Sequence, residues 1–599
     1  MLRLFFCIVL AINLTACSTR QAGLLQKNIP KQGPDNLFIW NEEHPVCSDW
    51  FPEYCLVNAF AADSRFSITK DKLDWLSRSA WMPSRQLVKK YVLQSLNEFR
   101  QIINQQAFTW TQWHSYWLEQ ARMNPSVDLM LSASEAERLQ MLLFDPPQAL
   151  SPPDVEISQN RNQTTVELYQ SYVDLVRQGS RASEEKPIIG IVTSGAADPY
   201  SSIAYYAEVF EQAGAKTVWI PMNTSFYKAQ KTKTETSNCR VEDFVLKDYP
   251  LLQLKQQSVK DYQEKQNFYC QNPSVVESIL RSINGLFFMG SDEKRLWQTF
   301  EADKKSDFPL SPIIFERFDK GHLIVGGKKE SLVPFSMLVS SLPMKPVGVT
   351  RADYASLSSL LKSSQAGWTY AEEDCGQIMP CETSTKNTTS PILLTTSIFH
   401  RHRFTQLLKA LQDQNGRLGL GLTSETALIM SSARFETIQF RVVGKGGLLI
   451  VNPKQADYDT NKKNFVVEDI ELNFINADTK GKFQKSAGVL GFGLLNSTLE
   501  NSFALMDPFI LLDFNEVFPL KASVFEMIKR DDIQWEYQNN EWELELLKGE
   551  NYWVQGDNQL QEKNDKDDFT SSSFSGLEMS LTFPLPQVNH VLKEKTDEK

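Results

Sequence analysis

The sequence has no long uncharged apolar run after its first residues, which argues against a membrane-spanning helix in the body of the chain. Such a helix needs about 20 predominantly apolar residues in succession. The nearest candidate, residues 503–517, contains Asp507, Asp513 and Glu516. We therefore expect the chain after its N-terminal segment to fold in water.

Basic clusters are also absent from the sequence. The 62 Lys and Arg residues are outnumbered by 73 Asp and Glu residues, which gives a formal net charge of −11. Binding to the phosphates of a nucleic acid needs Lys and Arg gathered on one surface. The sequence therefore predicts no nucleic-acid partner.

Metal-ligand motifs are missing as well. The chain has 8 cysteines but no Cys-x-x-Cys pair, and His44, His114, His322 and His590 share no motif. Structural zinc sites usually combine such pairs at short, regular spacings. We predict no metal site and no cofactor.

The N-terminal residues form an export signal. Arg3 is followed by an apolar stretch at residues 4–14 and by small residues before Cys17. A stretch this short is typical of a cleaved signal peptide. The segment LTAC, residues 14–17, resembles the lipobox of bacterial lipoproteins, in which the cysteine is diacylated and becomes the new N-terminus. An ordinary signal peptide with a chance cysteine is the alternative interpretation.

Lipidation of Cys17 predicts a protein held on a membrane without a spanning helix, because two or more acyl chains anchor stably where one does not. Ser18 follows the lipidated position. By resemblance to the sorting rules of Gram-negative bacteria, a residue other than Asp there favours the outer membrane. We expect a protein of the cell envelope that faces the periplasm or the cell surface.

The remaining cysteines favour disulfides. Cys7 leaves with the signal and Cys17 takes lipid, so 8 cysteines become six. An even number in an exported protein indicates disulfide bonds, although sequence cannot choose among the many connectivities. Nearest-neighbour pairing gives Cys47–Cys55, Cys239–Cys270 and Cys375–Cys381.

Composition and periodicity divide the chain into successive regions. The predicted boundaries are a signal peptide at 1–16, a lipidated tether at 17–36, a helical aromatic-rich region at 37–150, a linker helix at 151–186, an α/β domain at 187–485, a C-terminal extension at 486–554 and a flexible tail at 555–599.

The region 37–150 is predicted to be helical and rich in tryptophan. Apolar residues recur at helical spacing at Val88, Tyr91, Val92, Leu96, Phe99 and Ile103. Seven tryptophans lie between Trp40 and Trp117. They could form a platform for a carbohydrate or another ligand, but packing in a core is the interpretation that we favour.

From residue 187 onward, strands and helices alternate. Apolar runs at 188–192, 218–220, 285–289 and 323–325 predict buried parallel strands. Helices are expected after the first run, with Gly214 ending one of them, and from Asp292 onward. This order predicts a doubly wound, mostly parallel sheet whose sites lie at the carboxyl ends of the strands.

Four segments of this domain together resemble the cyanophycinase-like serine peptidases. They are IIGIVTSGAADPYSSIAYYAEVFEQAGAKTVWIPM, GLFFMGSDEKRL, FHRHRFTQLLKALQDQNGRLGLGLTSETALIM and VVGKGGLLIVNPKQADY, and they follow one another in the order of that family. The resemblance covers residues 187–485. It implies a flavodoxin-like fold related to class I glutamine amidotransferases, and cleavage of peptides, notably of the aspartate–arginine polymer cyanophycin.

The resemblance also gives a place for each member of a catalytic triad, and each place is substituted. The family's elbow GTSAGA corresponds to GGKKES at residues 326–331, so the serine slot falls on Lys328, or on Lys329 after a slip of one. The histidine slot falls on Ser397 and the carboxylate slot on Ser424. Glu425 lies one residue away and, in a strand, would point to the other face.

An active hydrolase would therefore need relocated groups. Ser331 or Ser336 could act as nucleophile with His400 or His402 as base. A third possibility is a desolvated lysine that acts as nucleophile or base.

Binding residues are predicted at two places. The family's substrate-approaching segment GGDQ corresponds to GSDE at 290–293, which keeps Asp292 and places Glu293 beside it. Arg401 and Arg403 could meet an acidic ligand. We expect a lipid-anchored protein with a catalytically degenerate domain that binds a peptide, a glycan or an envelope protein, with an active peptidase as the alternative.

Overall fold

The structure is a computed structural model. It describes residues 35–41, 45–56, 66–79, 81, 85–104, 106–123, 131, 133–145, 153–179, 186–232, 239–254, 260–332, 335, 338–340, 392–396, 398, 404, 407–408, 411–412, 418–431, 437–453, 457–460, 464–486, 489–494, 534–538, 543–555 and 573–584.

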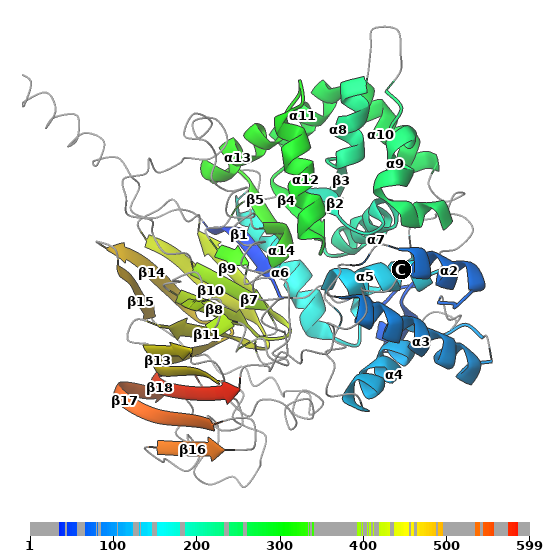
Figure 1. Cartoon of the computed structure of the whole chain (residues 1–599). Coiled ribbons are helices and arrows are strands. Elements are labelled where there is room, and N and C mark those ends of the chain that lie inside the picture. Colours follow the sequence, from blue (N-terminus) through cyan, green and yellow to red (C-terminus); the bar gives the residue numbers. More distant parts are fainter. Residues whose placement is uncertain are drawn as a thin grey trace, which may run out of the picture.

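A large mixed sheet lies at the centre of the described chain (Figure 1). Its strands follow the order β15-β14-β10-β9-β1-β5-β4-β2-β3. They are β1 (Asp35–Trp40), β2 (Ile188–Gly195), β3 (Lys216–Ile220), β4 (Gly285–Gly290), β5 (Ile324–Lys328), β9 (Thr426–Ser431), β10 (Thr437–Gly444), β14 (Lys480–Ser486) and β15 (Val489–Leu494). Neighbours from β3 to β1 are parallel, and neighbours from β1 to β15 are antiparallel.

Helices cover both faces of the parallel strands. Phe287 and Phe288 are successive residues of β4, so their side chains point to opposite faces. The Phe287 ring lies 5.0 Å from the ring of Phe210 in α7 (Pro199–Gln212). The Phe288 ring lies 6.2 Å from the ring of Phe300 in α12 (Glu293–Lys304). The mixed α/β class predicted from the sequence is confirmed.

Further helices extend these two layers. They are α6 (Gln163–Gly179), α8 (Thr224–Thr232), α9 (Glu242–Asp248), α10 (Lys260–Gln271), α11 (Pro273–Ser282), α13 (Ser311–Asp319) and α14 (Lys329–Leu332). The linker helix predicted before the domain is α6, which packs against β5 and β10. Gly214 follows α7 with a φ of 101°, as predicted for a helix end, and the N–H of Ala215 donates to the carbonyl of Phe210.

The N-terminal region is helical and buries its tryptophans. Its helices are α2 (Lys70–Arg78), α3 (Gln86–Ile102), α4 (Trp110–Met123) and α5 (Ala133–Leu143). The predicted apolar stripe of α3 is buried at Val88, Val92, Leu96 and Phe99. The tryptophans at positions 40, 50, 81, 110, 113 and 117 are buried too. Six of the seven tryptophans therefore pack in the core, as the packing interpretation predicted.

The first described strand corrects the predicted boundary at residue 37. Residues 35–40 were assigned to a tether and a helical region, but they form β1 inside the main sheet. Phe38 pairs with Gly326 of β5 on one side and with Ile429 of β9 on the other. Residues 37–40 are a continuous apolar run, which suits a strand buried on both faces.

A second sheet carries the C-terminal residues. Its order is β16-β17-β18-β13-β11-β8-β7-β6, and β12 pairs with β13. Its strands are β6 (Leu338–Ser340), β7 (Ile392–Thr396), β8 (Leu418–Leu422), β11 (Gly447–Asn452), β12 (Asp457–Thr460), β13 (Asn464–Asn476), β16 (Gln534–Gln538), β17 (Glu543–Gln555) and β18 (Ser573–Pro584).

Strand β18 corrects the prediction of a flexible tail at 555–599. The apolar residues Leu577, Met579, Leu581 and Phe583 alternate along it, which is the period of a strand.

Two of the three predicted disulfides are confirmed. Cys47 bonds to Cys55 and Cys239 bonds to Cys270, with Cα atoms 4.5 Å and 5.9 Å apart. The third predicted pair, Cys375–Cys381, lies outside the described residues, as does Cys17.

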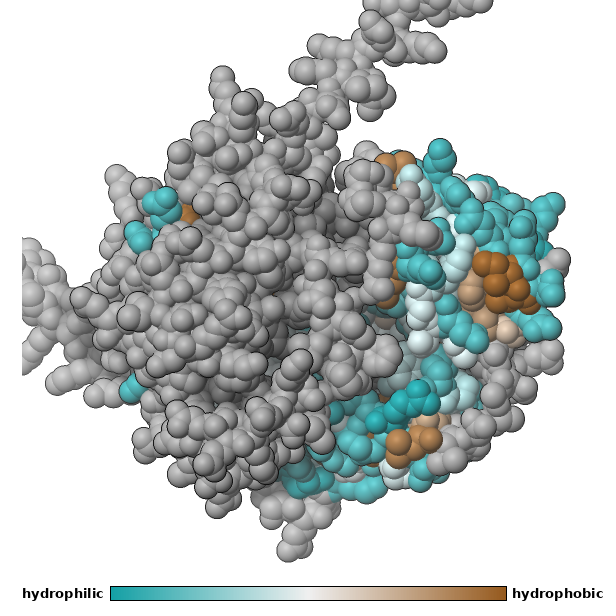
Figure 2. All heavy atoms as spheres, turned by 90° about the horizontal axis from the view of Figure 1, so that it is seen from below, coloured by the Kyte–Doolittle hydropathy of each residue, from teal (hydrophilic) through white to brown (hydrophobic). Residues whose placement is uncertain are grey.

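The described surface is polar, with isolated apolar side chains. On the face shown in Figure 2 the described part is mostly hydrophilic, with separate small hydrophobic areas. Large exposed apolar side chains occur singly, at Leu56, Leu87, Ile102, Phe268 and Phe308. Within the described ranges, no helix is both long and apolar enough to cross a membrane.

Removal of each disulfide tests how it stabilises the fold. The bridged cysteines are 8 residues apart in Cys47–Cys55 and 31 apart in Cys239–Cys270. Closing a longer loop removes more entropy from the unfolded chain, so we expect losses of about 2.5 kcal/mol and about 3.7 kcal/mol, respectively. Urea unfolding of the two double Cys→Ser variants measures both. A larger loss for the shorter loop would contradict this explanation.

Candidate functional site

The order of the parallel strands directs attention to the edge of the main sheet where their carboxyl ends lie. From β2 the chain moves outward to β3, and it then returns to β4 on the other side of β2. In open α/β sheets, ligands bind in the crevice outside the carboxyl ends of the strands where the order reverses in this way. The loops that follow β2 and β4 are therefore the first candidate for a site.

These two loops are in direct contact. The Asp292 N–H donates to the carbonyl of Gly195 at 3.1 Å. Gly290 has a φ of 96°, and a Cβ atom on it would lie 2.0 Å from the carbonyl carbon of Gly195. Only glycine combines this conformation with this approach. The end of β4 is thereby held against the end of β2.

The carboxylate of Glu137 bridges the same two loops. Its Oε1 accepts from the N–H of Ala197 and its Oε2 accepts from the N–H of Ser291, both at 2.9 Å. These N–H groups lie just before α7 and α12, so the carboxylate faces the N-terminal ends of two helices. Such ends attract anions through their free N–H groups and the helix dipole. Glu137 comes from α5, outside the α/β domain.

Other charged groups of this edge serve the fold. The Asp292 Oδ1 atom accepts from the N–H of Arg295 at 3.0 Å, so it caps α12. Arg295 donates to the carbonyl of Ala196 at 2.6 Å. Its guanidinium carbon lies 4.8 Å from the ring centre of Tyr249, whose pKa is raised by burial and lowered in part by Arg295. Asp292, predicted as a binding residue, is therefore occupied as a helix cap.

A strand-to-helix turn lies at the residues where the elbow was expected, and its side chains contact the β4 loop. Strand β5 ends at Lys328 and α14 begins at the next residue, which is a sharp strand-to-helix turn. The Lys328 Nζ atom donates to Ser291 Oγ at 3.2 Å. Ser331 is buried, and its hydroxyl donates to the carbonyl of Gly290 at 2.6 Å. The hydroxyl of Ser331, the alternative nucleophile, is therefore engaged in a hydrogen bond to a backbone carbonyl.

The predicted carboxylate slot lies at the same edge, two strands away. Lys328 is opposite Trp40 of β1, and Trp40 is opposite Ala427 of β9. Two strand spacings amount to about 10 Å. Ser424 lies in the turn that leads into β9.

Glu425 was expected to lie in a strand and to point to the opposite face from Ser424, and this expectation is wrong. It lies in the turn after β8 with a φ of 54°. Its Oε1 atom accepts from Asn162 Nδ2 at 2.5 Å, and its Oε2 atom lies 3.9 Å from Lys445 Nζ. The carboxylate therefore holds the turn to the start of α6 and to the loop after β10.

Several predicted site residues lie outside the described part of the chain. They are Ser336, Ser397, His400, Arg401, His402 and Arg403. Glu293 opens α12, but its side chain is not among those described.

The described groups of this edge do not form an acid–base pair. The two described histidines lie elsewhere, His114 in α4 and His322 before β5 at the opposite end of that strand. Where the chain is described, no group of His, Cys, Asp and Glu is placed to hold a metal ion. The arrangement supplies backbone donors for an anion, and Glu137 already satisfies two of them.

Sequence reasoning missed Glu137 because it lies far from the loops that it joins. It is 60 residues from Ala197 and 154 residues from Ser291. No local spacing links a residue of a helical region to two distant turns. The buried cap Asp198, which accepts from the N–H groups of Tyr200 and Ser201, could have been found from the pattern Asp-Pro at the start of α7.

Comparison with known proteins adds no relative. No protein-family model matches the chain, and no curated protein matches it significantly.

Truncation of Glu137 tests the role of its carboxylate. Glu137→Ala leaves two N–H groups at partly buried positions without their acceptor, so we expect the free energy of unfolding to fall by about 1–3 kcal/mol. Glu316→Ala removes an exposed carboxylate that pairs with Lys320 and is the matched control, for which we expect no measurable change in the free energy of unfolding. Urea unfolding measures both, and equal small effects would show that the bridge does not stabilise the fold.

Proposed function

We propose that this chain is a lipid-anchored protein of the bacterial envelope whose α/β domain has a binding or structural role and not a catalytic one. The observation that carries the proposal is the Glu137 carboxylate, which bridges the loops after β2 and β4. The place where a domain of this type would receive a ligand's anionic group is filled by the protein's own side chain.

The proposed fold is flavodoxin-like, of the kind found in class I glutamine amidotransferases. The order β3-β2-β4-β5 and the helices on both faces of these strands support it. The resemblance to cyanophycinase-like serine peptidases is part of the same proposal. It rests on the four sequence segments and on the strand-to-helix turn at Lys328.

The loss of catalysis is supported by what each described slot does. Lys328 stands in the serine slot and donates to Ser291. Ser424 stands in the carboxylate slot and has no acid group to orient a base. The alternative nucleophile Ser331 donates to a backbone carbonyl. A triad needs a hydroxyl, a base and an orienting carboxylate in one hydrogen-bonded chain.

The envelope location is supported by the signal sequence and by Cys17. Residues 18–34 separate the lipidated position from β1. A chain of this length reaches at most about 60 Å when fully extended. The proposed partners are the membrane, through the lipid, and a peptide, a glycan or an envelope protein.

An activity assay separates the non-catalytic proposal from a relocated active site. We expect the purified mature protein to release no product from cyanophycin or from a panel of dipeptides above the buffer blank. Turnover that a serine-directed inhibitor abolishes would contradict the proposal. The double variant Lys328→Ser, Ser397→His is the comparison. If only this variant hydrolyses a substrate, the loss of catalytic activity is explained by the residues that now occupy these two slots.

Palmitate labelling tests the anchor. We expect the full-length chain to incorporate labelled palmitate in a Gram-negative host. Cys17→Ala should incorporate none, because the sulfur of Cys17 is the acylated atom. Cys7→Ala keeps the lipobox and is the matched control. Label retained in Cys17→Ala, or processing that is insensitive to globomycin, would contradict lipidation at this position.

A further inference from the structure

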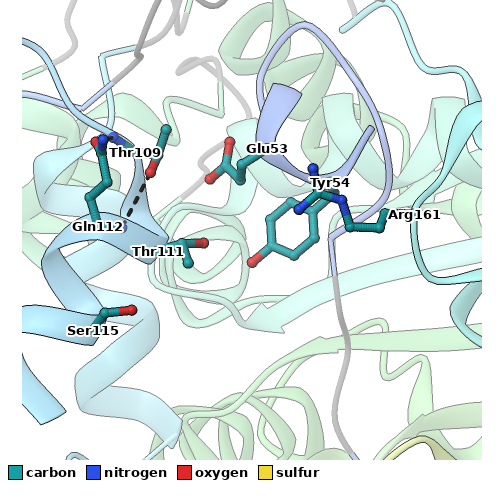
Figure 3. Close-up of a pocket in the computed structure, with 7 residues that line it drawn as sticks. All are labelled: Glu53, Tyr54, Thr109, Thr111, Gln112, Ser115 and Arg161. Atoms are coloured by element: carbon teal, nitrogen blue, oxygen red, sulfur yellow. Dashed lines mark hydrogen bonds between the residues drawn. The ribbon is translucent and has the colours of Figure 1, made fainter. Parts of the chain in front are cut away.

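A pocket in the N-terminal region lies apart from the edge described above. It opens between the short helix η2 (Pro52–Tyr54) and the start of α4 (Figure 3), and its volume is about 520 Å³. Pockets that bind small molecules have volumes of about 300–1,000 Å³. Its lining residues are Glu53, Tyr54, Thr109, Thr111, Gln112, Ser115 and Arg161.

The walls of this pocket are held in place. The Cys47–Cys55 disulfide closes the segment that contains η2. The N–H of Arg161 donates to the carbonyl of Tyr54 at 2.7 Å. Thr109 and Gln112 cap the start of α4 reciprocally, each side chain accepting from the other residue's N–H. The backbone around the pocket is therefore fixed before a ligand binds, and only the Glu53 side chain has to turn for its buried carboxylate to reach the ligand.

Glu53 is the unusual member of the lining. Both carboxylate oxygens are buried, and neither has a hydrogen-bond partner of ordinary geometry among the described residues. Burial raises the pKa of Glu53, although the nearby N–H groups of Glu53 and Trp110 lower it in part. An unpaired buried carboxylate is unfavourable, and such groups in proteins are usually paired or hydrogen-bonded.

The remaining polar groups surround this carboxylate. In Figure 3 the Glu53 carboxylate and the Tyr54 hydroxyl point toward Thr111, and Arg161 lies on the other side of Tyr54. Thr111 and Ser115 are exposed, so the pocket opens along α4. Arg161 donates to the carbonyl of Cys55 at 3.5 Å and has no acidic partner in the described chain.

We propose that this pocket binds a free amino acid or a short peptide, with the ligand's ammonium group beside Glu53 and its carboxylate toward Arg161. An ammonium group has three donors and no acceptor. It can donate to the carboxylate, in a charge-assisted hydrogen bond, and to the hydroxyls of Tyr54 and Thr111. The guanidinium suits a carboxylate at the other end.

This assignment is independent of the proposal for the α/β domain. It rests on a different region of the chain, and either can fail alone. A neutral sugar would also meet several hydroxyls here, but it would leave Glu53 without a positive charge and Arg161 without a negative one. The charge pair therefore favours a zwitterionic ligand.

Calorimetry on the mature full-length protein tests the assignment. The probe is L-alanyl-L-alanine, compared with N-acetyl-L-alanyl-L-alanine, in which the ammonium is blocked, and with glucose. We expect the free dipeptide to bind, and acetylation to weaken binding about tenfold or more, because a charged hydrogen bond is lost. Absence of heat from the free dipeptide at about 10 mM, which is above the millimolar range of weak binding, would overturn the proposal.

Variants locate the binding. Glu53→Gln keeps the shape of the side chain and removes its charge, and we expect a loss of affinity similar to that caused by acetylation. Glu119→Gln changes an exposed position on α4 outside the lining and is the matched control. Equal affinity in Glu53→Gln and the unmodified protein, or glucose binding that Glu53→Gln abolishes, would contradict an amine site. If Glu53→Gln does not fold, the acetylated probe still decides the question on the unmodified protein.

Discussion

One carboxylate, that of Glu137, accepts hydrogen bonds from backbone N–H groups after β2 and after β4. Two helices begin just after these loops, and without Glu137 the N–H groups of Ala197 and Ser291, which precede the helices, would lose this acceptor. Because Glu137 belongs to α5, the same contact fastens the N-terminal helices to the α/β sheet. The Tyr205 hydroxyl, which accepts from the N–H of Val46 at 2.7 Å, adds a second link between these regions.

The edge of the sheet is built around this contact. Gly290 allows the β4 loop to reach Gly195, and Lys328 and Ser331 each donate to the β4 loop. These bonds use the groups that a hydrolase would need free. The packing of the edge therefore supports the proposed non-catalytic role. In the pocket of the N-terminal region, by contrast, both oxygens of the Glu53 carboxylate are buried and neither makes a hydrogen bond of ordinary geometry within the described residues.

Local patterns predicted much of the fold. The apolar runs that became β2 and β4, the stripe of α3 and the glycine after α7 each depend on neighbours along the chain. Strand β1 was missed because its partners, β5 and β9, lie hundreds of residues away and its run is short. Strand β18 was missed although its alternating apolar residues were visible, since the charged residues before it dominated the composition. Glu137 and Glu53 gave no local signal, because their roles depend on contacts made only in the folded chain.

Hydrogen exchange at the amides of Ala197 and Ser291 tests the central contact most directly. An amide hydrogen-bonded to a carboxylate exchanges only when the contact opens. Exchange at both amides should quicken by about tenfold or more in Glu137→Ala, as expected for the loss of about 1.4 kcal/mol or more. Amides elsewhere in β2 and β4 should change less. Unchanged exchange at Ala197 and Ser291 would contradict the bridge.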